Sequence, residues 1–353
     1  MIHGGDTLSY ESFYEGELVD FSSNINPLGT PKGLHEKLIQ GFDTLTAYPD
    51  IKYRKLKTSI SQYLGCSIDN ILVGNGAVEI IDNFIISAKR IVTTMPAFAE
   101  YSLRAVAHHK ELIEIPYGED FKVNLDDIEK NIQAGDLLVL GNPNNPTGLR
   151  IEKDVLLNIY RIIEDKGGYL LLDEAFYEFC PYDYDSIQMF KEFGYKNVGI
   201  IRAATKFFAL PGIRLGYACA SVEKVDEIGK IELPWSINSL ADIAGQYIFL
   251  DREYIEKSKG YIEKERHYML ENLSNIPWIR VYPTSTNYIL IRLNRWDEEY
   301  VFKEFLSRGI VIRKCSSFRG LDNRYIRVAI KDRENNTKLL NIFRELTEEV
   351  GMI

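Results

Sequence analysis

Short apolar segments rich in β-branched residues alternate with longer amphipathic stretches over the first 220 residues or so. The apolar segments predict seven strands, at residues 71–73, 90–94, 111–115, 137–140, 169–172, 198–201 and 215–220. Helical patterns lie between them, for example at 55–64, closed by Gly65, and at 151–165, closed by Gly167 and Gly168. Near-continuous apolar strands separated by helices predict an α/β fold with a mostly parallel sheet covered on both faces.

The pattern changes after about residue 222. The remaining segments predict a helix at 253–273, a strand at 288–292, a helix at 298–308, strands at 310–313 and 325–329, and a helix at 336–350. A chain of 353 residues fits two domains. We predict an N-terminal arm at 1–30, a large domain at 31–235 and a small α+β domain at 236–353. Since no repeat or flexible linker separates them, we expect the two domains to pack closely.

Composition limits the class of partner. The net charge of −9 and the lack of a Lys/Arg run argue against nucleic-acid binding. The N-terminus has no signal-peptide pattern, and no stretch approaches the 18 apolar residues of a membrane span. The four cysteines are scattered without metal-ligand spacing, which is typical of reduced thiols. We therefore expect a cytoplasmic protein without a metal site, whose partners are small molecules and other protein chains.

Lys206 lies between an apolar strand and the apolar segment Phe207-Phe208-Ala209-Leu210. A charged lysine is costly to bury there, and burial lowers the pKa of an amine, which favours a nucleophilic lysine. Taken alone, the residue is better explained as a lysine that extends to solvent from a strand end. Arg214 follows a Pro-Gly turn and can return to the same pocket as a phosphate ligand.

Asp173 ends the apolar segment Leu170-Leu171-Leu172. Ligands of open α/β sheets bind at the carboxyl ends of strands, where this carboxylate is expected. Next to a pyridine nitrogen it would keep that nitrogen protonated and make the ring an electron sink. A helix cap or a metal ligand is the alternative, but no second group of ligands supports a metal.

Three further segments follow strand ends. Asn145 lies in a Pro- and Gly-rich segment, where a side-chain amide can donate to a ligand or where a plain surface turn can form. Gly76, Ala77 and Val78 begin a predicted helix, whose backbone amides can approach a phosphate. Phe98 can stack on an aromatic ligand, although a single aromatic residue is more often part of a core.

Together and in this order, these five segments resemble the class I/II aminotransferase-like family of pyridoxal-5′-phosphate (PLP) enzymes. The resemblance covers nearly the whole chain and implies the aspartate-aminotransferase fold (fold type I). It implies that Lys206 carries PLP as a Schiff base, with Asp173 at the pyridine nitrogen, Asn145 at the phenolic oxygen and Phe98 stacked on the ring. It assigns the cofactor phosphate to the backbone of Gly76, Ala77 and Val78 and to Arg214. Tyr48 matches a tyrosine that reaches the phosphate of a neighbouring subunit, which implies a homodimer with shared active sites.

Within this family, both ends of the chain look most like the threonine-phosphate decarboxylases. The start contains His3-Gly4-Gly5-Asp6 and Asp20-Phe21-Ser22-Ser23-Asn24, and the end contains Arg313 and Arg327 on predicted neighbouring strands. The resemblance implies that His3, Gly4, Asn24, Asn145, Arg313 and Arg327 bind a phosphorylated amino acid. Two arginines can make forked contacts with its carboxylate and phosphate groups. In the alternative, His3 is a frayed terminal residue and the arginines are surface charges.

The expected reaction is decarboxylation of L-threonine O-3-phosphate to (R)-1-amino-2-propanol phosphate, a step of cobalamin synthesis. Histidinol-phosphate aminotransferase resembles the core of the chain equally well and is the main alternative. A catalytically silent PLP-fold binding protein is a remote one. Two residues depart from the family pattern: Ala203 replaces a serine that usually helps to hold the cofactor phosphate, and Phe176 replaces a tyrosine. Thr205 is a candidate replacement for that serine.

Overall fold

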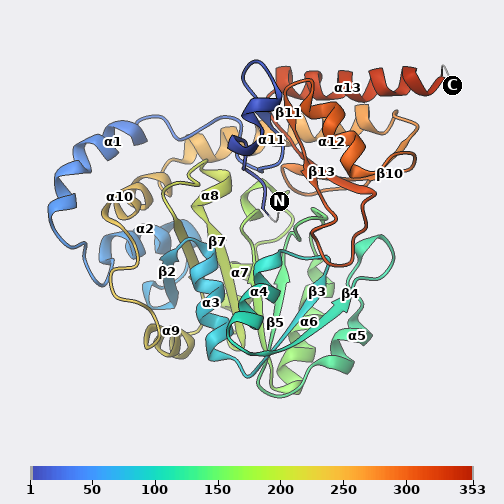
Figure 1. Ribbon diagram of the computed structural model, residues 1–353. Helices are drawn as coiled ribbons and strands as arrows, with labels where there is room; N and C mark the ends of the chain where they lie inside the picture. Colours follow the sequence, from blue (N-terminus) through green and yellow to red (C-terminus); the bar gives the residue numbers. More distant parts are fainter. Residues whose placement is uncertain (1–2, 352–353) are drawn as a thin grey trace.

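The computed structural model describes residues 3–351 and shows a large unit built on a seven-stranded sheet, with a smaller unit beside it (Figure 1). The strands of the large sheet are β2 (Ile71–Asn75), β3 (Arg90–Met95), β4 (Glu111–Pro116), β5 (Asp136–Gly141), β6 (Tyr169–Asp173), β7 (Val198–Ala203) and β8 (Leu215–Cys219). Their order is β2-β8-β7-β6-β5-β3-β4, and every pair is parallel except those that β8 forms with its two neighbours. The predicted mostly parallel sheet is thus confirmed.

Helices cover both faces of this sheet, and each face has its own apolar core. The helices of the large unit are α1 (Leu34–Gly41), α2 (Arg54–Leu64), α3 (Ala77–Ser87), α4 (Ala99–Ala107), α5 (Leu125–Asn131), α6 (Lys153–Lys166), α7 (Ser186–Lys191), α8 (Ala204–Phe207), α9 (Val222–Gly229) and α10 (Ser239–Ile248). Short 3-10 helices are η1 (Leu8–Phe13), η2 (Phe42–Thr46), η3 (Ile68–Asn70), η4 (Glu119–Phe121) and η5 (Tyr177–Phe179). Gly65 and Gly167 end α2 and α6 with φ values of 66° and 72°. Glycine tolerates this left-handed conformation, which is why these helices stop there.

The smaller unit is α+β. It contains α11 (Arg252–Leu273), β9 (Ile279–Val281), β10 (Tyr288–Leu293), α12 (Glu298–Leu306), β11 (Ile310–Val311), β12 (Arg313–Lys314), β13 (Tyr325–Ala329) and α13 (Arg333–Gly351). An antiparallel sheet has the order β12-β13-β10-β9. The first half of α11 contributes to the core of the large unit through Tyr254, Ile255 and Ile262. The exact domain bounds therefore remain a prediction.

The predicted strand at 310–313 is two short strands in different sheets. β12 joins β13, whereas β11 pairs in parallel with β1 (Val19–Asp20) of the N-terminal arm. The buried Ile312 separates them and packs in the core of the smaller unit. An apolar pattern predicts a strand but does not identify the strand with which it pairs. The partner of β11 is β1 of the N-terminal arm, which is far away in the sequence. This pairing fixes the arm on the smaller unit.

The arm, the smaller unit and the carboxyl ends of β5, β6 and β7 converge at one place in the molecule (Figure 1). Among residues 3–351, no helix is both long and apolar enough to cross a membrane.

Candidate active site

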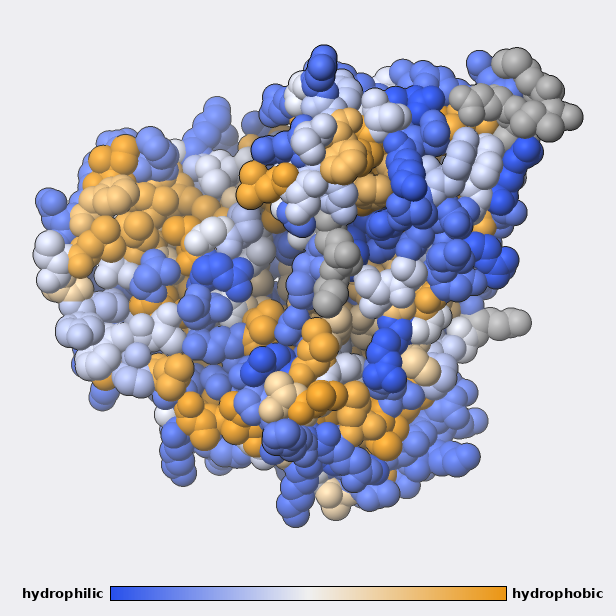
Figure 2. All heavy atoms as spheres, in the orientation of Figure 1, coloured by the Kyte–Doolittle hydropathy of each residue, from blue (hydrophilic) through white to orange (hydrophobic). Residues whose placement is uncertain are grey.

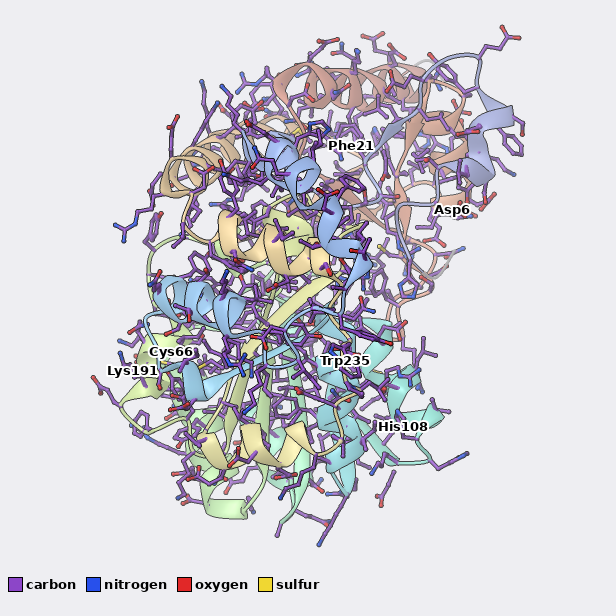
Figure 3. All side chains as sticks on the ribbon, turned by 90° about the vertical axis from the view of Figure 1, so that its left-hand side faces the viewer. Asp6, Phe21, Cys66, His108, Lys191 and Trp235 are labelled. Carbon is purple, nitrogen blue, oxygen red and sulfur yellow. The ribbon has the colours of Figure 1, made fainter. Side chains whose placement is uncertain are left out.

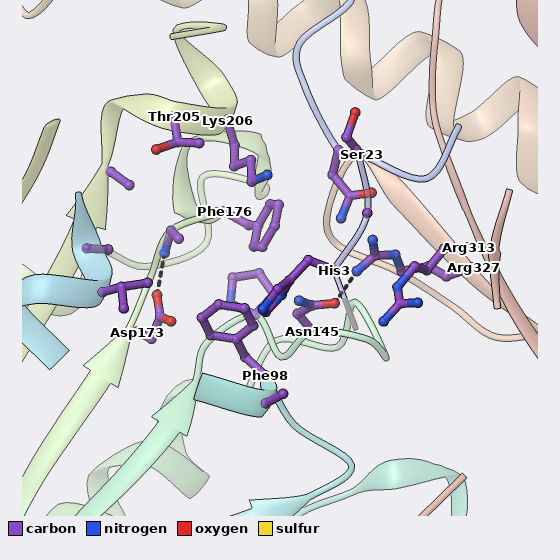
Figure 4. A pocket seen from close by; sticks show the side chains of 18 of the residues that line it. His3, Ser23, Phe98, Asn145, Asp173, Phe176, Thr205, Lys206, Arg313 and Arg327 are labelled. Carbon is purple, nitrogen blue, oxygen red and sulfur yellow. Dashed lines mark hydrogen bonds between the residues drawn. The ribbon is translucent and has the colours of Figure 1, made fainter. Parts of the chain in front are cut away.

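A pocket lies where the arm and the smaller unit meet the carboxyl ends of the central strands (Figure 4). Thirteen of the fifteen predicted site residues line it: His3, Gly4, Asn24, Ala77, Val78, Phe98, Asn145, Asp173, Thr205, Lys206, Arg214, Arg313 and Arg327. Gly76 lies directly beside the side chain of Arg214, at the edge of the same pocket. Lys206 and Asp173 occupy one end of the pocket, and the two arginines from the smaller unit occupy the other (Figure 4).

Lys206 lies on α8, a single turn that begins directly after β7. Burial lowers the pKa of its amine to about 8, and the nearby positive charges of Arg327 and Arg214 act in the same direction. The negative charge of Asp20 opposes this shift. An amine with this pKa is neutral in a sizeable fraction of molecules near neutral pH, which makes it a competent nucleophile and proton acceptor.

Asp173 is the last residue of β6 and is only 8% exposed. Burial raises the pKa of its carboxyl group, whereas two hydrogen bonds lower it. The Tyr101 hydroxyl donates to Oδ2 at 2.7 Å, and the Ala175 backbone N–H donates to Oδ1 at 3.1 Å. A buried carboxylate held in this way suits a cationic group on a ligand.

Tyr101 is a site residue that the sequence patterns did not reveal. It is buried on α4, three residues after Phe98, and lines the pocket together with that residue. The two rings meet edge to face with centroids 5.7 Å apart. Phe98 is the N-cap of α4 and Tyr101 lies in its first turn, and this i, i+3 spacing is the only signal that the sequence carries for Tyr101.

The N-terminus of α3 forms a cradle for an anion. Its first residues are Ala77 and Val78, whose backbone N–H groups have no partner within the helix. Gly216 on β8 lies beneath this end, and a Cβ at that position would be 2.4 Å from the Ala77 nitrogen. Arg214 completes the cradle, with its guanidinium beside Gly76. The absence of a side chain at Gly216 thus allows the strand to approach the helix end closely.

Both departures from the family pattern lie in the pocket wall. Phe176 packs edge to face on Tyr288 with centroids 4.9 Å apart, and its ring offers no hydroxyl to a ligand. Ala203 ends β7 and presents a methyl group to the pocket, while Thr205 lines the pocket two residues later.

At the other end of the pocket, Arg313 and Arg327 are directly paired across β12 and β13. Both are buried, and burial lowers the pKa of each guanidinium, in Arg327 to about 10. Arg313 donates to the Ser317 hydroxyl at 2.7 Å, and Arg327 donates to the Asn145 side-chain oxygen (Figure 4). Two adjacent cations removed from water favour an anionic ligand strongly.

His3 and Gly4 line the same pocket as these arginines. Nε2 of His3 is 3.0 Å from the Glu100 carboxylate, and its ring centroid is 6.0 Å from that of Phe98. Asn24 also faces the pocket, and its buried side-chain oxygen has no protein partner among the described residues. His3 is therefore a pocket residue in this structure and not a frayed end.

Tyr48 lies elsewhere, on the surface. Its side chain is 79% exposed and packs against the tilted ring of Trp235, with ring centroids 4.6 Å apart. Within one chain it contributes nothing to the pocket.

Known proteins are similar to this chain over nearly all of its length. The family model for class I and II aminotransferases matches residues 16–343. A protein of Caldanaerobacter subterraneus that carries the provisional name threonine-phosphate decarboxylase is 39% identical over 98% of this chain and 94% of its own length. Threonine-phosphate decarboxylase of Salmonella typhimurium is 33% identical over 94% of this chain and 91% of its own. The crystal structure of histidinol-phosphate aminotransferase from Clostridium acetobutylicum matches with a TM-score of 0.90 and 38% identity, over 94% of this chain and 100% of its own.

Proposed function

Because the chain belongs to the family of class I and II aminotransferases, which are PLP-dependent enzymes, we propose that it decarboxylates L-threonine O-3-phosphate to (R)-1-amino-2-propanol phosphate. The curated relatives include both threonine-phosphate decarboxylases and histidinol-phosphate aminotransferases. The choice between these reactions therefore depends on the substrate end of the pocket.

The residues of the pocket fit PLP. Lys206 supplies an amine of lowered pKa, and Asp173 supplies a buried carboxylate for a ring nitrogen. The cradle at Ala77 and Val78, with Arg214 beside it, suits a phosphate, and it exists only because Gly216 has no Cβ. The methyl group of Ala203 removes one hydrogen bond to that phosphate, a loss of about 1.5–3 kcal/mol unless another donor such as Thr205 compensates.

When bound, the cofactor supplies an electron sink for the electron pair of a bond broken at the substrate Cα. The chain's own residues decide which bond is broken, because they orient the substrate. Arg313 and Arg327 hold its carboxylate and phosphate, and Lys206 returns a proton to Cα after CO2 has left. His3 and Gly4 cover the substrate and restrict the access of water.

One observation supports the proposal most strongly: His3 and Gly4 line the pocket together with the paired arginines. L-Threonine O-3-phosphate carries two anionic groups on a short skeleton, and a pocket with two buried guanidinium groups and the His3 imidazole matches that charge pattern. Phe176 is in keeping with this proposal, because it departs from the tyrosine that we expect in a histidinol-phosphate aminotransferase.

Histidinol-phosphate aminotransferase remains the second candidate function. It is favoured by the likeness to the Clostridium acetobutylicum structure, at 38% identity and a TM-score of 0.90. An aminotransferase of this kind would use the same arginines for the phosphate of one substrate and the carboxylates of the other.

An assay without an acceptor separates the two functions. The PLP-loaded protein is mixed with O-phospho-L-threonine in the absence of any 2-oxoacid, and CO2 is measured. We expect continuous CO2 release that is abolished in the Lys206→Ala variant. Turnover that requires 2-oxoglutarate and releases no CO2 would refute the decarboxylase and support the aminotransferase.

We also propose that the protein is a homodimer with shared active sites. An apolar surface gathers around α1 and is visible at the left of Figure 2, where Ile39, Phe42 and Leu45 are each more than half exposed. Trp235, which packs against Tyr48, lies on the face that Figure 3 turns to the viewer. A second copy packed on this face would cover apolar area and bring Tyr48 toward the cofactor phosphate of the neighbouring subunit.

A further inference from the structure

The Asp20 carboxylate organises a tight turn at the end of β1. It accepts hydrogen bonds from the Ser22 backbone N–H at 2.8 Å and from the Ser23 backbone N–H at 3.2 Å. It also accepts from both serine hydroxyls, that of Ser22 at 2.6 Å. Ser22 and Ser23 line the pocket, and Asp20 lies behind them. A single charged group therefore fixes the shape of this part of the pocket wall.

Ser22 makes two further contacts, which connect separate parts of the site. Its hydroxyl oxygen accepts from the Gly5 backbone N–H at 2.8 Å, and its carbonyl oxygen accepts from the Arg327 guanidinium at 2.8 Å. Because the hydroxyl hydrogen is donated to Asp20, the oxygen is left to accept from Gly5. Because the Ser22 hydroxyl donates to the Asp20 carboxylate, its oxygen is a stronger acceptor for the Gly5 backbone N–H.

The N-terminal strap, defined here as residues 3–5, lies in direct contact with Ser22. A Cβ at Gly4 would be 2.1 Å from the Ser22 carbonyl oxygen, a distance that no side chain tolerates. At its other end, His3 contacts Glu100 in the first turn of α4. The strap therefore connects Ser22 with the large unit, and His3 and Gly4 of the strap line the pocket.

Arg327 depends on the same serine. Its guanidinium is buried and contacts both the Ser22 carbonyl and the Asn145 side chain. A hydrogen-bonded path thus runs from Asp20 through Ser22 to Arg327 and Asn145, and a branch runs to the strap. The charge of Asp20 also raises the pKa of Arg327 against the larger opposing effect of burial.

We propose that Asp20 is a positioning residue, which through Ser22 holds the N-terminal strap and the Arg327 guanidinium in one arrangement and thereby sets the affinity for the phosphorylated substrate. This inference rests on the proposed function, in which the strap and Arg327 bind that substrate. It assigns the main effect of Asp20 to substrate binding, although the Asp20 charge also opposes the lowering of the Lys206 pKa.

The first test is the Asp20→Asn variant, which keeps the size of the side chain but removes its charge and one acceptor oxygen. We expect KM for O-phospho-L-threonine to rise about tenfold, as the loss of one charge-assisted hydrogen bond predicts. We expect kcat and the dissociation constant of PLP to change by less than about threefold, because the lost contacts act on substrate binding. Asp322→Asn is the matched control, since Asp322 accepts from the Arg324 backbone N–H at 2.9 Å in an exposed turn.

A double-variant cycle tests whether Asp20 acts through the strap. Gly4→Ala forces the strap away from Ser22 without changing Asp20. If the strap is the intermediary, the double variant Gly4→Ala/Asp20→Asn has a KM close to that of the weaker-binding single variant. A double variant whose KM rises by the product of the two single-variant factors would contradict the proposal.

Hydrogen exchange gives a readout that does not depend on turnover. Asp20→Asn is expected to accelerate exchange of the Gly5 amide about tenfold or more, while amides in the core of the large sheet stay protected. The proposal is overturned if the Gly5 amide and KM are both unchanged, or if protection is lost throughout the molecule.

The test of the proposed function can fail without refuting the role of Asp20. If the unmodified protein releases no CO2 from O-phospho-L-threonine, the decarboxylase is refuted. The same variants are then compared with histidinol phosphate and 2-oxoglutarate, and the exchange of the Gly5 amide still decides the role of Asp20.

Discussion

Lys206 combines burial with a position between the cofactor cradle and the substrate arginines. Burial is the main cause of its lowered pKa of about 8, and two nearby arginines add to it. Burial disfavours the protonated form of an amine, so the neutral form of Lys206 predominates above about pH 8, whereas an ordinary lysine becomes neutral only near pH 10.4.

This shift predicts the pH dependence of Lys206 labelling. In cofactor-free protein, the rate at which a small amine-reactive reagent modifies Lys206 should rise about tenfold per pH unit below pH 8 and level off above it. Peptide mass spectrometry measures the modification at this residue, and the Lys206→Ala variant gives the background. A rate at Lys206 that keeps rising in parallel with the exposed lysines up to pH 10 would show that the pKa is not lowered.

Tyr101 is expected to control the protonation of Asp173. The hydrogen bond from the Tyr101 hydroxyl lowers the Asp173 pKa. The Tyr101→Phe variant removes this hydrogen bond. Without that hydrogen bond the Asp173 pKa should therefore rise further above its ordinary value. Since PLP binding uses the ionised carboxylate, the loss of PLP affinity on acidification should begin at a higher pH.

Titration of PLP binding at a series of pH values measures this effect. Tyr169→Phe is the control, because it removes a buried hydroxyl that has no hydrogen-bond partner among the described residues. Overlapping pH profiles for Tyr101→Phe and the unmodified protein would contradict the assignment.

At the residue scale, the sequence predicted the groups that belong to linear motifs. Lys206 and Asp173 each follow an apolar strand, and Arg313 and Arg327 lie on strands that the structure pairs directly. Tyr101, Ser22 and Asp20 were not predicted as site residues. Their importance arises from contacts between elements far apart in the chain, such as the 2.8 Å contact between Arg327 and Ser22, and no local pattern encodes such contacts.

Among the elements, the contact of β8 with the first turn of α3 is the one on which the cofactor cradle depends. A Cβ at Gly216 would lie 2.4 Å from the Ala77 nitrogen and 2.5 Å from the Gly76 carbonyl carbon. Both are backbone atoms, so the end of α3 must move to accommodate a side chain. The amides that face the phosphate would move with it.

Gly216→Ala should therefore weaken PLP binding about tenfold or more, because misplaced amides lose their hydrogen bonds to the phosphate. Absorbance titration with PLP measures the dissociation constant. Gly260→Ala is the control: Gly260 is exposed within α11 and has open space around it, so alanine there should leave PLP binding unchanged and raise the melting temperature slightly. Unaltered PLP affinity in Gly216→Ala would show that the cradle does not hold the phosphate.

The sequence predicted the elements better than their partners. All seven strands of the large sheet were expected from their apolar segments, which are most continuous in central strands buried on both faces, such as β5 and β7. The predicted strand at 310–313 was wrong as a single element, since β11 and β12 enter different sheets. Hydrophobicity identifies a buried strand, but the pairing of β11 with the N-terminal arm depends on the whole chain.

At the scale of the whole molecule, the proposed dimer with shared active sites can be tested by mixing two inactive variants. Lys206→Ala and Tyr48→Ala proteins should each be nearly inactive alone. If Tyr48 serves the neighbouring subunit, each mixed dimer contains one site with both residues intact. Random reassociation should then restore about a quarter of the unmodified activity per subunit.

Exchange under mild denaturant followed by an activity assay measures this recovery. Two Lys206→Ala preparations mixed in the same way provide the control. If the mixture of Lys206→Ala and Tyr48→Ala forms dimers but stays as inactive as its components, Tyr48 does not act across the interface.

The partition of O-phospho-L-threonine between two fates tests the central claim most directly. The PLP-loaded protein is supplied with this substrate together with 2-oxoglutarate, and CO2 and glutamate are measured in the same sample. Decarboxylation predicts one CO2 for each substrate consumed, with (R)-1-amino-2-propanol phosphate as the product and no glutamate. Glutamate formed in step with substrate loss, without CO2, would contradict the decarboxylase and identify the protein as an aminotransferase.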